Sequence, residues 1–97
     1  MSHSWPFAEP KDMPVFTTAE VISGEDWIFF VTHDEEDGYW QFHGAGDSES
    51  AQMISFAKIY SIDPKLAELA DLPLGWCAWR DSQNEPWQRK LNSRTIK

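Results

Sequence analysis

Four consecutive acidic side chains stand before a glycine at residues 34–38, and clustered carboxylates are ligands that calcium prefers. The spacing argues against a calcium loop. With Gly38 as its sixth position, an EF-hand loop would begin at His33 and end at Gly44, where the motif requires Asp and Glu. The same residues are typical of a solvated β-hairpin tip, because Gly38 supplies the positive φ that such turns need. The tip could instead contact a cationic partner, through Asp34, Glu35, Glu36 and Asp37.

Two histidines, His33 and His43, flank the same hairpin and could be read as a metal pair. A simple register pairs His33 with Tyr39 and Phe29 with His43, which places both imidazoles on one face. The two rings then stand about 13 Å apart along the strands, too far to chelate one ion. We therefore expect no metal site.

Paired carboxylates are a second possible source of chemistry. Asp47, Glu49 and Asp81 fall on expected loops beside aromatic strands, where a sugar-cleaving site would need its acid and base. Nothing in the sequence places one of them in the apolar pocket that such catalysis requires. The chain also lacks G-x-S-x-G, a Cys–His signature and a phosphate-binding glycine loop. We therefore predict a non-enzyme, with no catalytic residue and no cofactor.

Aromatic residues and an arginine gather near the C-terminus. Alternation along a strand puts Trp76 on one face and Trp79 on the other, so we expect at least one of them in the core. Trp79, Arg80 and Trp87 could form an exposed aromatic–cation patch that binds a partner, because Trp and Arg dominate binding hot spots. The sequence favours the alternative, which is ordinary packing with cation–π contacts.

Charge limits the class of partner. The 97 residues carry 16 acids against 8 bases, a net charge of −8, which repels nucleic acid and anionic membranes and favours a cationic protein. The charge is uneven, because residues 1–71 hold 14 of the acids and residues 72–97 hold 5 of the bases.

Other features of the sequence bear on the cellular location of the protein and on the state of its cysteine. The single cysteine, Cys77, excludes an intramolecular disulfide and lies in an apolar run that predicts burial. The N-terminal residues lack the pattern of a secretory signal, and no apolar stretch approaches the roughly 20 residues that span a bilayer. We expect a cytoplasmic protein.

The elements that must position these residues form one domain over residues 15–90. Residues 1–14 contain three prolines and predict an extended arm, docked by Trp5 and Phe7. Residues 91–97 predict a frayed basic tail. The last strand could pair across a dimer, although Pro86 and nearby charges blunt that edge. The expected strands cover residues 15–17, 27–33, 39–43, 53–56, 74–80 and 86–89.

Short helices are expected between these strands. Thr17 or Thr18 precedes a helical turn that Gly24 ends, Ser55 precedes a second turn, and Asp63 followed by proline is a clear helix start. Strands joined as hairpins around such helices indicate an α+β fold, in which an antiparallel sheet packs against one or two short helices. The simple hairpin register puts Ile28, Phe30, Trp40 and Phe42 on the core face and Trp27, Phe29, Val31, Tyr39, Gln41 and His43 on the other.

Two stretches are familiar in combination: VFTTAEVISGEDWIFFVTHDEEDGYWQFHGAGD and IYSIDPKLAELADLPLGWCAWRD. Together they resemble the small bacterial domains that include immunity proteins of polymorphic-toxin systems, over roughly Val15 to Asp81. The matching positions are mostly turn, cap and core residues. No catalytic residue carries over from that family. The resemblance implies a non-enzymatic, cytoplasmic protein that binds another protein.

These observations favour a protein-binding module of the kind that inhibits a bacterial toxin. A toxin that acts on nucleic acid has a basic cleft, which the acidic hairpin tip could occupy. Two alternatives remain open. One is a small-ligand or carbohydrate-binding domain that stacks its ligand on Trp76, Trp79 or Trp87, and the other is an accessory protein with a constitutive partner.

Overall fold

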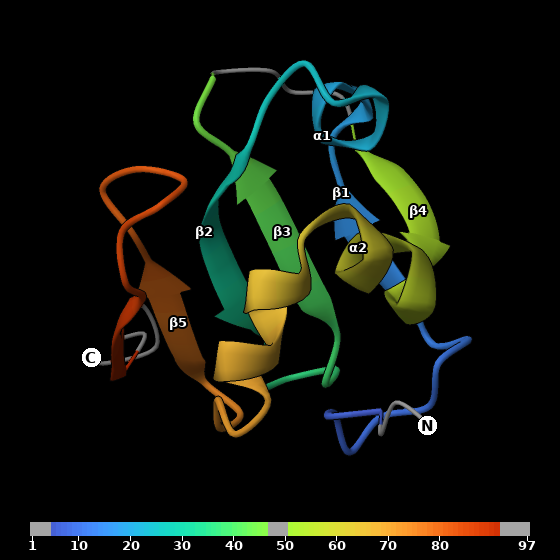
Figure 1. Cartoon of the computed structure of the whole chain (residues 1–97). Coiled ribbons are helices and arrows are strands. Elements are labelled where there is room, and N and C mark those ends of the chain that lie inside the picture. The colour runs from blue at the N-terminus through green and yellow to red at the C-terminus, as the bar shows by residue number, and fades with distance from the viewer. Residues whose placement is uncertain (1–4, 47–50, 92–97) are drawn as a thin grey trace.

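The computed structural model describes residues 5–46 and 51–91. Within these residues, six strands form one sheet and three short helices pack with it, which confirms the α+β class (Figure 1). The helices are α1 (Ala19–Ser23), α2 (Phe56–Ile62) and the 3-10 helix η1 (Pro64–Leu69). The strands are β1 (Pro14–Thr17), β2 (Ile28–His33), β3 (Trp40–Gly44), β4 (Gln52–Ser55), β5 (Trp76–Trp79) and β6 (Gln88–Leu91).

The sheet is mostly antiparallel, as the sequence predicts, and contains one parallel pair of strands. The strand order is β4-β1-β3-β2-β5-β6, and β1 and β3 run parallel where Phe16 pairs with Gln41. The other neighbouring strands are antiparallel. The parallel pair arises because α1 and β2 separate β1 from β3 in the chain, and such a crossover lets two strands run in the same direction.

The β2–β3 hairpin differs by one residue from the simple register. His33 pairs with Trp40 rather than with Tyr39, because Tyr39 belongs to the turn. A β-bulge between Ile28 and Phe30 then leaves the residue between them without a partner on β3. The shift changes the predicted faces of three side chains: Val31 and His33 lie on the side of Trp40 and Phe42, and Phe30 lies on the opposite side.

Side-chain caps position the helices as the sequence predicts. Thr18 accepts a hydrogen bond from Val21 N at 3.1 Å, and α1 ends at Gly24. Ser55 caps α2 in the same way, accepting from Lys58 N at 3.1 Å. These local contacts explain why both helices begin where the sequence signals stand.

The helix that starts after Asp63 is a 3-10 helix rather than an α-helix. Its Leu66 and Leu69 are both fully buried, and Leu72, which follows, is also in the core. A spacing of three residues matches the 3.0 residues per turn of a 3-10 helix, so these leucines share one face.

The N-terminal arm packs on the core, as predicted. Phe7 is buried, and its ring centroid lies 4.4 Å from that of Phe56 on α2. Trp5 lies edge-on to Phe56 at 5.5 Å. Backbone bonds add to this docking, since Phe56 N donates to Met13 O at 2.9 Å. Large aromatic side chains thus supply the apolar area that a short chain needs for a core.

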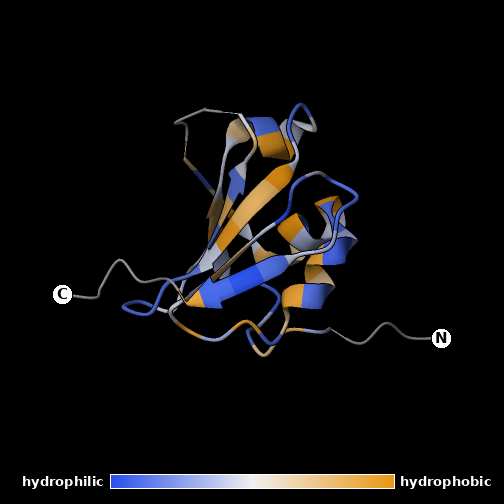
Figure 2. Ribbon diagram, turned by 90° about the vertical axis from the view of Figure 1, so that its left-hand side faces the viewer, coloured by the Kyte–Doolittle hydropathy of each residue, from blue (hydrophilic) through white to orange (hydrophobic). Residues whose placement is uncertain are grey.

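The two faces of the sheet have different surroundings. Helices α2 and η1 and residues 5–13 lie on one face, here called the covered face (Figure 2). No helix in the described ranges lies on the opposite face, here called the open face. Within the same ranges, no helix is long and apolar enough to cross a membrane.

Candidate protein-binding surface

The acidic hairpin tip is a well-ordered turn with exposed carboxylates. Asp34 Oδ1 accepts from Glu36 N at 2.8 Å, and Asp37 Oδ1 accepts from Tyr39 N at 3.0 Å. Gly38 has φ 76°, the left-handed value that the sequence predicts. Two of the four acids therefore shape the turn, as Asx side chains commonly do. Negative charge nevertheless remains exposed at this end of the sheet.

His33 has structural partners on the covered face. Its Nδ1 lies 2.8 Å from Leu72 O, and its Nε2 lies 3.4 Å from Glu9 Oε2. The ring stacks on Trp40 at 4.2 Å, and the Trp40 indole donates to the same Glu9 oxygen at 3.1 Å. A glutamate of the arm thereby joins two residues of the β2–β3 hairpin.

His43 lies on the open face, so the expectation that the two histidines share a face is wrong. The one-residue register shift is the cause, because it moves His33 to the other side of the sheet. Among the described residues, no group of three His, Cys, Asp or Glu is placed to hold a metal ion. Asp81 is exposed on the turn after β5, and Asp47 and Glu49 lie outside the described residues.

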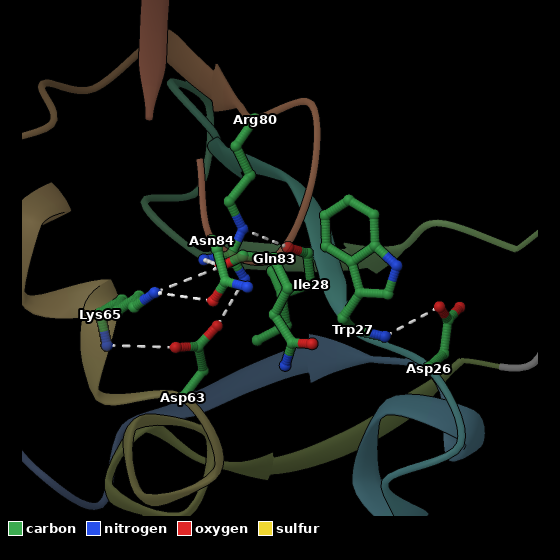
Figure 3. A network of polar contacts seen from close by, with 8 residues as sticks. All are labelled: Asp26, Trp27, Ile28, Asp63, Lys65, Arg80, Gln83 and Asn84. Carbon is green, nitrogen blue, oxygen red and sulfur yellow. Dashed lines mark hydrogen bonds and ion pairs between the residues drawn. The ribbon is translucent and has the colours of Figure 1, made fainter. Parts of the chain in front are cut away.

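Arg80 does not belong to an exposed aromatic–cation patch, because its side chain is completely buried, and the favoured expectation of ordinary packing holds for it. Its guanidinium forms an ion pair with Asp63 at 2.5 Å and donates to Ile28 O and Gln83 O at 2.9 and 3.2 Å (Figure 3). It lies 4.2 Å from the ring centroid of Trp87. A buried charge must be paired to be tolerated, and these contacts pair it.

The Arg80 cluster therefore joins three parts of the chain. It links the start of η1, the start of β2 and the turn after β5 (Figure 3). Lys65 reaches the same turn, with Nζ 3.3 Å from Asn84 Oδ1. Trp76 and Trp87 pack against the core, so of the three C-terminal tryptophans considered for binding only Trp79 is on the open face.

The strand register assigns the side chains of the open face. Residues that pair directly on neighbouring strands have side chains on the same face of the sheet. A row of such pairs across the sheet therefore consists of neighbouring side chains on one surface. One row runs across all six strands and a second crosses β3, β2, β5 and β6. The first row is Met53, Phe16, Gln41, Thr32, Cys77 and Lys90, and the second is His43, Phe30, Trp79 and Gln88.

The bulge adds a further aromatic ring to this face. The rings of Phe29 and Phe30 are 6.4 Å apart, a distance that consecutive side chains on opposite faces cannot reach. Trp27 contacts Phe29 at 6.0 Å, and Phe30 contacts His43 at 5.7 Å. Phe16 contacts Tyr39 on another part of the face, at 5.8 Å. The first four rings, of Trp27, Phe29, Phe30 and His43, thus form an aromatic cluster separate from the core, and Phe16 and Tyr39 form a pair apart from it.

The two rows of the open face contain no carboxylate, although acids are common in the chain. None of the ten residues in the two rows is Asp or Glu, and Lys90 is the only fully charged one. Lys90 Nζ lies 5.5 Å from the Trp79 ring centroid. Met53 is 60% exposed and Phe29 is 37% exposed, so apolar surface reaches solvent. The centre of the face is apolar, and the acidic tip lies beside it, at the turn that joins β2 and β3.

Burial on this face changes the acidity of two groups. Desolvation lowers the pKa of His43 below the usual 6.5, which favours the neutral imidazole. Desolvation raises the pKa of the Cys77 thiol, and nearby Lys90 acts in the opposite direction. Cys77 is buried, as the sequence predicts. Both shifts favour uncharged side chains within the aromatic surface.

Comparison with protein-family models, with curated proteins and with solved structures finds no match. Arguments about function therefore rest on the residues of the open face and the hairpin tip.

Proposed function

We propose that this chain is a non-enzymatic protein-binding module that docks a protein partner on the open face of its sheet. The observation that carries the proposal is the second aromatic cluster, which lies outside the core and has none of the described helices over it. Large aromatic residues dominate the affinity of protein interfaces, and contiguous exposed apolar surface is typical of binding sites.

The charge distribution supports a partner with a basic rim. Protein interfaces commonly have an apolar centre and a polar margin, and here two rows of side chains without carboxylates lie beside the acidic tip of residues 34–37. With a net charge of −8, the chain attracts a basic partner from a distance, and the apolar face then provides the contact. The partner that fits best is a protein with an apolar patch surrounded by Lys and Arg.

An immunity-type inhibitor of a bacterial toxin is the specific form of this proposal. The resemblance to immunity proteins supports it, as does the basic substrate cleft of toxins that act on nucleic acid. In this form the module acts in the bacterial cytoplasm, and its tip enters the cleft while the open face packs beside it.

A capture experiment tests the proposal. Tagged protein is used to capture partners from native host lysate at moderate salt, beside two variants that each lose one exposed apolar side chain. Phe29→Ser removes a ring from the open face, whereas Leu74→Ser alters the loop before β5 and serves as the control. We expect one stoichiometric basic partner that Phe29→Ser loses and Leu74→Ser retains.

Two results would overturn the proposal. The first is a partner that a folded Phe29→Ser, Trp79→Ala double variant retains in full. The second is the absence of any enriched protein from cells confirmed to make candidate partners. The small-ligand alternative would then be tested by following tryptophan fluorescence, since Trp79 is on the open face and partly exposed.

The acidic tip has its own test. Replacing Asp34 and Asp37 by Asn, and Glu35 and Glu36 by Gln, removes four charges and keeps the oxygen atoms that accept the turn's hydrogen bonds. Association with the captured partner should slow at least about tenfold at low salt and much less at high salt. An unchanged rate and salt dependence would mean that the tip is only a solvated turn.

A further inference from the structure

The two edges of the sheet differ in charge. β6 carries Arg89 and Lys90, and charged side chains on an edge strand oppose pairing with another strand. β4, at the other edge (Figure 1), has the sequence QMIS, with no charge, no proline and no recorded bulge. Within the described residues β4 pairs with β1 alone. Among the described residues no strand occupies its outer side, which can therefore act as a template for another strand.

The described elements that adjoin β4 also carry little charge. β1 holds no charged residue, and α2 holds one, Lys58. This is unusual in a chain with a net charge of −8, because carboxylates elsewhere would repel a second copy. At β4 two copies can approach without bringing carboxylates of the strands themselves together. The occupant that this edge fits is thus a second copy of the chain.

We propose that the chain forms a homodimer through antiparallel pairing of β4 with β4 of a second copy. Such an interface is two-fold symmetric and self-complementary, because each strand presents the same edge to the other. The pairing joins two six-stranded sheets into one continuous sheet. This proposal is independent of the protein partner on the open face.

The alternation of side chains determines the register of this dimer. A continuous sheet requires residues of the open face to pair with residues of the open face. Met53 is on the open face, beside Phe16 of β1, whereas Ile54 packs against the core. Two symmetric registers satisfy this rule, centred on Met53 or on Ile54, and each pairs three of the four residues of β4. The exposed side chain of Met53 selects the register in which Met53 lies opposite Met53 of the second copy. Gln52 then pairs with Ile54 of the second copy.

This register explains the exposure of Met53. Its side chain is 60% exposed in the single chain, the largest exposure among the large apolar side chains outside the undescribed segments. In the dimer it contacts its symmetry mate, and Phe16 lies next to it in each copy. The open faces of the two copies then lie on the same side and form one longer surface.

The interface is short, so the dimer should be weak. A strand of four residues makes only a few interchain hydrogen bonds, and association has a large entropic cost. We expect half-dissociation in the range of about 10–500 μM. Sedimentation velocity on the full chain should show the mass rising from 11.2 kDa toward twice that value over this range.

A charge swap tests the register. Met53→Glu and Met53→Lys should each be monomeric at concentrations where the native chain is dimeric, because like charges directly opposite each other oppose pairing. An equimolar mixture of the two variants should recover the dimer. The matched control is Leu91→Glu, at an apolar position on β6 that is 51% exposed, which should leave the dimer unchanged.

Three results would overturn the proposal. The first is a native chain that remains monomeric at millimolar concentration. The second is a dimer that persists in both Met53 variants or is lost in Leu91→Glu, which would place the interface elsewhere. The third is a mixture of the two folded Met53 variants that stays monomeric. Far-ultraviolet circular dichroism of each variant confirms folding, so loss of the dimer is not confused with loss of structure.

Discussion

Both faces of the sheet are rich in aromatic residues, but the rings of the covered face pack into the core and those of the open face do not. On the covered face, Trp40 and Phe42 contact Phe56 of α2 and are fully enclosed. On the open face, Phe29 and Phe30 contact mainly rings of their own face and keep exposed edges. The comparison teaches that aromatic content alone does not define a core. The layer placed over a ring decides whether it contributes to folding or remains available for binding.

The largest difference is expected between matched phenylalanines on the two faces. Phe42→Ala on the covered face should lower the free energy of unfolding by about 3–5 kcal/mol, because it leaves a cavity in an enclosed core. Phe30→Ala on the open face should cost about 1 kcal/mol, since solvent can reach the space. Urea denaturation measures both values. Equal losses of unfolding free energy in the two variants would contradict the difference between the faces, because they would mean that the open face is as enclosed as the core.

The next largest effect concerns two ion pairs that differ in burial. Asp63→Asn removes the charge that neutralises buried Arg80 and should cost about 3 kcal/mol. The control is Asp71→Asn, which removes the partner of Arg89 at the surface, where Asp71 is 83% exposed. Exposed pairs contribute little, so no measurable change is expected in thermal unfolding. A loss in the control as large as in Asp63→Asn would contradict the assigned role of burial.

A smaller effect is expected for the arm on the covered face. Glu9→Ala removes the acceptor for the Trp40 indole and the carboxylate beside His33, and should cost about 1–2 kcal/mol. Glu9→Gln keeps an acceptor oxygen and should cost less. Urea denaturation of the two variants separates the hydrogen bond from the charge. Identical losses would show that the charge, and not the acceptor, holds the arm.

The smallest effect is a pH dependence specific to the open face. The pKa of His43 is lowered by burial, so between its folded and unfolded pKa values the folded state binds fewer protons than the unfolded state. Its contribution to stability is present above pH 6.5 and is lost as the pH falls through the folded pKa. Thermal unfolding at pH 7.5 and pH 5.0 should show a larger drop for the native chain than for His43→Gln. An equal drop in unfolding temperature for the native chain and for His43→Gln would exclude His43 as the source of the pH dependence.

Much of the fold is predictable from the sequence because its signals are local. Thr18, Ser55 and Asp63 each cap a helix in the structure, and the turn at residues 34–38 forms with Gly38 at positive φ. Caps and turns depend on neighbours within a few residues, so their chemistry is visible in the chain. The docking of Trp5 and Phe7 is also predictable, since exposed aromatic rings in an arm would leave apolar area in water.

The candidate surface is less predictable, because it depends on contacts between distant residues. The bulge that brings Phe29 and Phe30 to one face has no local signal, and without it alternation assigns them to opposite faces. Arg80 has the composition of a hot-spot residue, but Asp63 and the carbonyl of Ile28 enclose it. The spacing of polar residues along the chain does not reveal a hydrogen-bond partner that lies 17 or 52 residues away.

The sequence by itself determined the class of fold, the positions of the strands and helices, the acidic tip and the large aromatic content. Each of these follows from residue type and short-range spacing. Only the tertiary structure decided which aromatic residues form the core, that Arg80 is buried, and that β4 rather than β6 is the uncharged edge. The physical reason is that burial depends on what packs above a side chain, and long-range pairing places that layer.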